Sequence, residues 1–192
     1  ELTDVLDKYG ADALRYYLVS SPAVRAEDIA FSEKGLDEVV KKIISRLYNI
    51  IAFYELYRTG DLLMGEDANE HILDRWIMTR LAKLQKDVTS ALDRYELDRA
   101  SRPLNDFVDD LSTWYLRRSR TRPGVLPKLR QVLLEFAKIL APFMPFMAEE
   151  IYQRLRDNHN EESVHLENWP KPRKIDRKIL DEMKKTREIV SL

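Results

Sequence analysis

The chain has 192 residues, a formal net charge of −1 and no cysteine, with 44% hydrophobic and 34% charged residues. The lack of cysteine excludes disulfides and thiolate metal sites, and the near-zero net charge argues against general coating of nucleic acid. The sequence contains no run of about eighteen apolar residues, so it predicts no membrane-spanning helix. The first residue is not Met, so we expect a piece of a longer polypeptide. The length predicts one large domain, or one domain with a small appendage, and the few Gly and Pro residues favour long regular elements over turns.

The first part of the chain has helical periodicity. Residues 4–19 predict one helix, which Pro22 ends. Residues 33–58 give the clearest pattern, with apolar side chains at positions i, i+3, i+4 and i+7. Ser32 is a suitable N-cap for this second helix, and the polar stretch 59–67 predicts a loop after it.

The remaining sequence predicts four more helices, at residues 69–95, 98–121, 126–157 and 176–190. Pro103 is compatible only with the first turn of its helix or with a kink. Pro142 and Pro145 should bend or split the helix at 126–157. The stretch 164–166 could be a short strand. Long helices with short connections are typical of an antiparallel up-down bundle.

We therefore predict an all-α fold, an antiparallel helix bundle with an N-terminal linking helix and a short C-terminal helix. Its expected divisions are a linker at 1–35, the bundle at 36–157, and a polar tail with the last helix at 158–192. The expected core residues share the apolar stripes of the bundle helices. They are Trp76, Leu81, Phe107, Leu111, Leu133, Phe136 and Leu140.

No constellation in the chain predicts catalysis. His71, His159 and His165 lack partners at the spacing of zinc ligands, which favours surface roles. Five scattered glycines form no phosphate-binding loop, and the adjacent Glu149 and Glu150 cannot share one helix face. We expect no catalytic residue, no bound metal and no cofactor in this chain.

One segment of the chain is purely basic. Residues 111–134 contain six Lys or Arg and no acidic residue. A solvated helix end would explain one or two cations, but exposed faces usually mix charge signs. The run Arg117, Arg118, Arg120 and Arg122 beside aromatic residues suits phosphates and stacked bases. This pattern favours nucleic-acid contact without distinguishing RNA from DNA.

Two further residues leave alternatives open. Trp114 lies where the apolar stripe meets the arginines, so it could pack in the core or stack on a base. Asn49 stands among apolar residues of the second helix. It could be an ordinary surface residue, or an amide that hydrogen-bonds a base edge.

Several blocks of the sequence, in order, resemble class I aminoacyl-tRNA synthetases, and among them the isoleucyl enzymes. The resemblance covers residues 4–170, and its blocks are DKYGADALRYYLVSS at 7–21, RAEDIAFSEKG at 25–35, DRWIMTRL at 74–81, FVDDLSTWYLRRSR at 107–120, LAPFMPFMAEEIYQ at 140–153 and ESVHLENWP at 162–170. The valyl, leucyl and methionyl enzymes share the bundle. The stretch at 20–35 and WYLRRSR are more similar to the isoleucyl form.

The resemblance implies an anticodon-binding domain. The family joins isoleucine to its tRNA with ATP and Mg²⁺, and its catalytic signatures, absent here, lie upstream. The implied partners are the anticodon stem-loop of tRNA(Ile) and the catalytic domain of the same parent chain, in the cytoplasm and without a membrane. The implied tRNA-binding residues are Arg46, Asn49, Trp114, Arg117, Arg118, Arg120 and Arg122.

One stretch departs from the family pattern. RTRPGVLPK at 120–128 replaces the aromatic pair and polar loop that usually follow the arginines. Either the hairpin is shorter here or loop residues are missing from the sequence. A zinc module that ends many family members is also absent. The alternatives are the equivalent valyl or leucyl domain, and a helical protein-interaction module.

Overall fold

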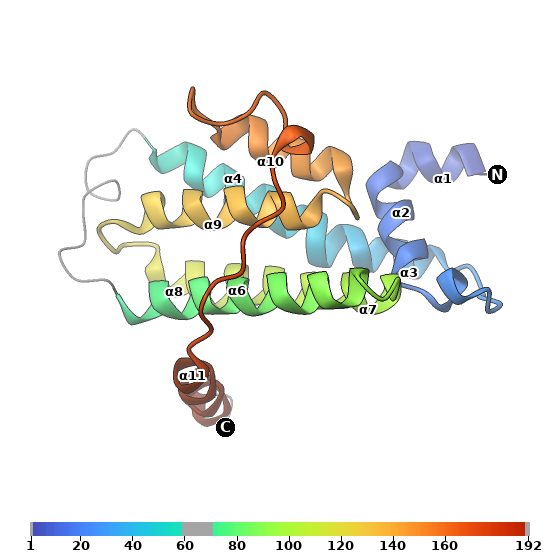
Figure 1. The fold of residues 1–192 in the computed structure, drawn as a ribbon. Helices are drawn as coiled ribbons and strands as arrows, with labels where there is room; N and C mark the ends of the chain where they lie inside the picture. The colour runs from blue at the N-terminus through green and yellow to red at the C-terminus, as the bar shows by residue number, and fades with distance from the viewer. Residues whose placement is uncertain (1, 59–70, 191–192) are drawn as a thin grey trace.

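The computed structural model describes residues 2–58 and 71–190, and over these residues it contains helices and no β-strand. The helices α4, α6, α7 and α9 run alongside one another as an antiparallel bundle, with α10 packed on α9 (Figure 1). The all-α bundle predicted from the sequence is confirmed. None of the helices in the described segments has both the length and the apolar content needed to cross a bilayer.

The first predicted helix is two helices, α1 (Leu2–Tyr9) and α2 (Ala11–Val19). Gly10 separates them with φ 80° and ψ 159°, backbone angles that residues other than glycine rarely adopt. The prediction of one continuous helix was wrong because the helical pattern of the flanking apolar residues does not reveal this glycine's conformation. A 3₁₀ turn, η1 (Pro22–Arg25), follows α2.

The second predicted helix is confirmed as a continuous helical stretch that contains a π-helical segment. It consists of α3 (Glu33–Val39), η2 (Val40–Ile44) and α4 (Ser45–Tyr57). The Ser32 hydroxyl accepts a hydrogen bond from the Gly35 N–H at 3.3 Å, as its predicted N-cap role requires. The loop expected at 59–67 lies entirely outside the described residues, as do residues 69 and 70 of the next predicted helix.

The next two helices form a hairpin. α6 (Ile72–Leu92) is capped by His71, whose Nδ1 accepts the Leu73 N–H at 3.1 Å. α7 (Leu97–Asp109) continues through a seven-residue π-helical segment, η3 (Asp110–Leu116), into α8 (Arg117–Ser119). Pro103 lies inside α7 rather than in its first turn.

The helix predicted at 126–157 is two helices, α9 (Val125–Leu140) and α10 (Pro145–Leu155). The last predicted helix is α11 (Arg177–Val190). The expected split near Pro142 is confirmed, and Pro145 opens α10, where its missing N–H costs nothing. The stretch Val164–Leu166, predicted as a possible strand, is a 3₁₀ turn, η4, because Ser163 caps it. In Figure 1 α11 is seen nearly end-on, so it crosses the bundle helices.

The core lies along the inner faces of the bundle. All seven core residues predicted from the sequence are at most 4% exposed. Phe107 of α7 and Phe136 of α9 stack with ring centroids 5.0 Å apart. Aromatic pairs of this kind add about 0.5 to 1.5 kcal/mol beyond the burial of their area, so this contact helps to fix α7 against α9.

The N-terminal helices are joined to the bundle by polar contacts as well as by apolar packing. The Tyr16 hydroxyl donates to the Ser101 carbonyl at 2.9 Å. The Asp12 carboxylate accepts the N–H of Met147 at 2.6 Å and thereby caps α10. Burial raises the pKa of Asp12, and the N–H donors of Met147 and Phe146 oppose that rise. These contacts hold α2 at one end of the bundle.

Candidate nucleic-acid interface

The predicted arginine run begins in α8, directly after the π-helical segment η3. Arg117, Arg118 and Arg120 are exposed, while Ser119 between them is buried. Among residues 2–58 and 71–190, none of these three guanidinium groups forms an ion pair with a carboxylate. The run therefore presents uncompensated positive charge to the solvent, as a phosphate-binding surface requires.

Trp114 holds one of these arginines in place. The Arg118 guanidinium carbon lies 3.2 Å from the centroid of the Trp114 ring, a cation–π stack. The indole N–H of Trp114 points to the Met183 sulfur at 3.1 Å. The ring is half-buried, so it belongs neither wholly to the core nor wholly to the surface, the two alternatives that the sequence left open.

The electrostatic environment of Arg118 is unusual for a surface arginine. Burial lowers the pKa of its guanidinium, and the nearby charges of Arg117 and Arg187 lower it further. Arginine stays protonated in proteins nonetheless. The charges of Arg117 and Arg187 repel that of Arg118, and an incoming anion would relieve this repulsion.

Arg122 has a different position from the other arginines of the run. Its Nη1 donates to Asp74 Oδ2 at 2.8 Å, and its Nη2 donates to Asp74 Oδ1. The Tyr115 hydroxyl donates to the same carboxylate at 2.6 Å. The side chain of Arg122 is 13% exposed and that of Asp74 is 4% exposed. The guanidinium of Arg122 is thus bound to Asp74 inside the protein, where it joins the α8–α9 turn to α6. The tRNA contact predicted for Arg122 stays a prediction.

The turn that follows α8 is short. The Arg122 N–H donates to the Ser119 carbonyl at 3.0 Å, and Gly124 adopts the left-handed conformation with φ 71° immediately before α9. Only glycine takes this conformation readily. As the sequence stands, the stretch 120–128 therefore forms a tight turn between α8 and α9.

The two predicted residues of α4 differ from the α8 arginines in their surroundings. Arg46 Nη1 donates to Asp109 Oδ1 at 2.6 Å, at the junction of α7 and η3. Asn49 is exposed, almost one turn further along α4. Within the described segments, no hydrogen bond or ring contact joins either residue to Arg117, Arg118 or Arg120. Arg46 is therefore partly neutralised, and Asn49 offers a free-standing surface amide.

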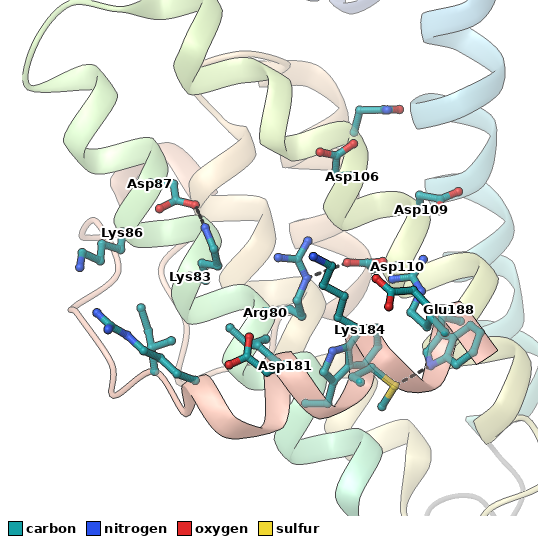
Figure 2. A pocket seen from close by; sticks show the side chains of 18 of the residues that line it. Arg80, Lys83, Lys86, Asp87, Asp106, Asp109, Asp110, Asp181, Lys184 and Glu188 are labelled. Carbon is teal, nitrogen blue, oxygen red and sulfur yellow. Dashed lines mark hydrogen bonds and ion pairs between the residues drawn. The ribbon is translucent and has the colours of Figure 1, made fainter. Parts of the chain in front are cut away.

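A cleft of about 1210 Å³ lies between α6, α7, η3 and α11. Figure 2 shows its charged lining, with Arg80 directed at Asp110 and Lys83 directed at Asp87. Lys184 of α11 lies beside these pairs. Basic and acidic side chains alternate here, so the cleft lacks the one-signed charge of the α8 surface. In the described part of the chain, no cluster of three or more His, Asp or Glu is placed to hold a metal ion.

Sequence reasoning missed the contribution of α11. Its buried residues Ile179 and Met183 turn one face toward the bundle, and this face brings Arg187 to within 5.2 Å of the Trp114 ring centroid. The spacing of Ile179 and Met183, four residues apart, was the available signal. It identifies the packed face of α11 without identifying the helix on which that face packs.

The chain is similar to known proteins in both sequence and fold. Residues 74–192 match the family described as the anticodon-binding domain of tRNA ligase. The chain belongs to this family. The matched span includes the α8 arginines and α11, whereas Arg46 and Asn49 precede it. The family match also agrees with the expectation that this stretch carries a binding domain rather than the ligase chemistry.

Several isoleucine–tRNA ligases align with almost the whole of this chain. That of Chlamydia trachomatis serovar D is 40% identical over 208 residues, and that of Protochlamydia amoebophila is 38% identical over 207 residues. Each alignment covers 98% of this chain and 20% of the relative. The chain thus spans about a fifth of the length of the ligases it matches.

A solved structure confirms the fold. The LeuRS of Agrobacterium radiobacter, crystallised as a ternary complex with tRNA and LeuAMS, superposes with a TM-score of 0.65 at 22% identity. The match covers 94% of this chain and 21% of that protein. The helix arrangement of this chain therefore recurs in that LeuRS.

Proposed function

We propose that this chain binds the anticodon stem-loop of tRNA(Ile) as part of an isoleucine–tRNA ligase. The observation that carries the proposal is the group Arg117, Arg118 and Arg120, three exposed guanidinium groups without carboxylate partners in the described residues. They belong to an anticodon-binding family whose whole-chain relatives here are isoleucine–tRNA ligases. Those relatives favour the isoleucyl enzyme over the valyl or leucyl one.

The three arginines would neutralise phosphates of the anticodon stem. Guanidinium groups bond phosphate oxygens through two parallel N–H donors. Such contacts fix the position of the RNA without reading its sequence. Reading would need a group that reaches unstacked bases, and the exposed amide of Asn49 has the required donors and acceptor.

The rest of the ligase would supply the chemistry. In this proposal residues 1–35 connect the domain to the catalytic part of the same parent, residues 36–157 form the tRNA-binding bundle, and residues 158–192 form the tail with the last helix. ATP and Mg²⁺ would act in that catalytic part, in the cytoplasm. The present chain would bind tRNA without activating isoleucine.

The proposal is tested by titrating the chain with a tRNA(Ile) transcript at two salt concentrations. Three phosphate contacts, at a slope of about 0.7 to 0.9 each, predict that fourfold more salt weakens binding about 20- to 40-fold. A transcript with a replaced anticodon separates base reading from phosphate contact, because only reading makes the two affinities differ. Absence of binding to both transcripts at the lower salt would contradict the proposal.

A further inference from the structure

Two arginines from helices far apart in the sequence meet at one indole ring. Arg118 of α8 lies 3.2 Å and Arg187 of α11 lies 5.2 Å from the Trp114 ring centroid. The Trp114 N–H is directed at Met183, four residues before Arg187 on α11. The ring therefore fixes the positions of both guanidinium groups and brings α11 next to the basic surface of α8.

The charges at this junction do not balance. Asp110 is 5% exposed and lies between two arginines, with Arg80 Nε donating to its Oδ2 at 2.7 Å and Arg187 Nη1 donating to its Oδ1. One carboxylate thus serves two guanidinium groups. Arg117 and Arg118 beside them have no carboxylate partner among the described residues. The positive charge is therefore uncompensated on the α8 side of the junction, whereas the cleft side of Arg187 and Asp110 carries both signs of charge.

The two arginines that meet at Trp114 also remain accessible. Arg118 is exposed, and the side chain of Arg187 is 35% exposed despite its bond to Asp110. A guanidinium has five N–H donors, and the hydrogen bond of Arg187 to Asp110 uses only one of its nitrogens. Both groups therefore have donors left for an anion that approaches from solvent.

We propose that α8 and α11 together form a binding site for an RNA backbone phosphate, with Arg118 and Arg187 as its ligands and Trp114 as the residue that positions them. The inference rests on the proposed function and extends the RNA-binding surface from α8 to the last helix. The lowered pKa of Arg118, caused first by burial and then by Arg117 and Arg187, agrees with a site whose like charges await an anion.

The test compares Arg187→Gln with Lys185→Gln in the whole 192-residue chain. Lys185 is exposed on the same helix, and its change removes the same single charge. We expect Arg187→Gln to weaken tRNA binding about three- to tenfold and to reduce the salt slope by about 0.7 to 0.9, the value of one phosphate contact. Lys185→Gln should change the affinity less than about twofold and leave the slope intact.

A third variant separates phosphate contact from anchoring of α11. Met183→Ala removes a buried contact of this helix and leaves every charge in place. If Arg187 only anchors α11, then Arg187→Gln will weaken binding without changing the salt slope, as Met183→Ala would. That result, or equal effects of Arg187→Gln and Lys185→Gln, would overturn the shared site while leaving the proposed function standing. If the chain without any substitution binds no tRNA, both the proposed function and this site are overturned.

Discussion

Two arginine-rich corners of the molecule differ in how their charges are partnered. The turn between α6 and α7 gathers four arginines, and each has a carboxylate within 3.3 Å. Arg94 and Arg99 share Glu96, whereas Arg25 and Arg102 share Asp98. The corner at α8 has Arg117, Arg118 and Arg120, and none of them has a carboxylate partner among the described residues.

The comparison shows that the number of arginines does not mark a nucleic-acid surface. The segment 93–102 contains as many acidic as basic residues, whereas 111–134 contains basic residues alone. Exposed ion pairs contribute little to stability, typically 0 to 1 kcal/mol, but they cancel the field that attracts phosphate. The absence of acidic neighbours therefore distinguishes the two corners, and Arg122 adds a third case in which burial removes the arginine from the surface.

The largest effect is expected at Arg122. Arg122→Ala would leave the buried Asp74 carboxylate with the Tyr115 hydroxyl and without a cationic partner among the described residues, and an uncompensated buried charge costs about 3 to 5 kcal/mol. Urea unfolding measures this loss. The exposed Arg120 provides the control, since Arg120→Ala should change the free energy of unfolding by less than about 0.5 kcal/mol. Equal losses from both variants would refute the structural role assigned to Arg122.

The corner between α6 and α7, where the arginines are paired with carboxylates, should become an RNA-binding surface once those carboxylates are removed. The double change Glu96→Gln and Asp98→Asn would leave Arg94, Arg99 and Arg102 without their carboxylate partners. We expect tRNA affinity at low salt to rise about three- to tenfold through contact that is independent of sequence. A filter-binding titration with tRNA and with an unrelated RNA measures it. Unchanged affinity for both RNAs would show that missing carboxylates are not what distinguishes the α8 corner.

The smallest expected effect is on stability and concerns the backbone of the turn between α6 and α7. Tyr95 is 90% exposed and has φ 59°. It ends α6 in a Schellman arrangement, with Glu96 N–H bonded to the Ala91 carbonyl at 2.9 Å, where glycine is preferred. Tyr95→Gly should stabilise the fold by about 0.5 to 1 kcal/mol in urea unfolding. Tyr95→Ala keeps a Cβ in the left-handed region and should give no such gain; a gain from both would point to the ring instead.

Much of the fold could be predicted because helical periodicity is local. Apolar spacing identified the bundle helices and the core from Trp76 to Leu140, and Pro142 and Pro145 marked where the helix predicted at 126–157 splits. The break at Gly10 was missed because a glycine inside a helical pattern does not reveal its backbone angles. The π-helical segments were missed because an inserted residue leaves no distinct signal in composition.

The candidate site was only partly predictable because exposure and partners depend on tertiary contacts. Within one run of arginines, Arg118 is exposed and Arg122 is bonded to Asp74, which lies 48 residues away. No local pattern separates the two. Arg187 was missed for the same reason, since its neighbour Trp114 comes from another helix.

The central claim is that the unpaired arginines of α8, and not arginines in general, bind tRNA. Its most direct test compares two double variants that remove the same two charges, Arg117→Gln with Arg118→Gln and Arg94→Gln with Arg99→Gln. We predict that the α8 pair weakens binding of tRNA(Ile) about 10- to 40-fold at 0.1 M salt, the loss of two phosphate contacts. The α6–α7 pair should change it less than about twofold. Equal weakening by the two folded variants would contradict the account.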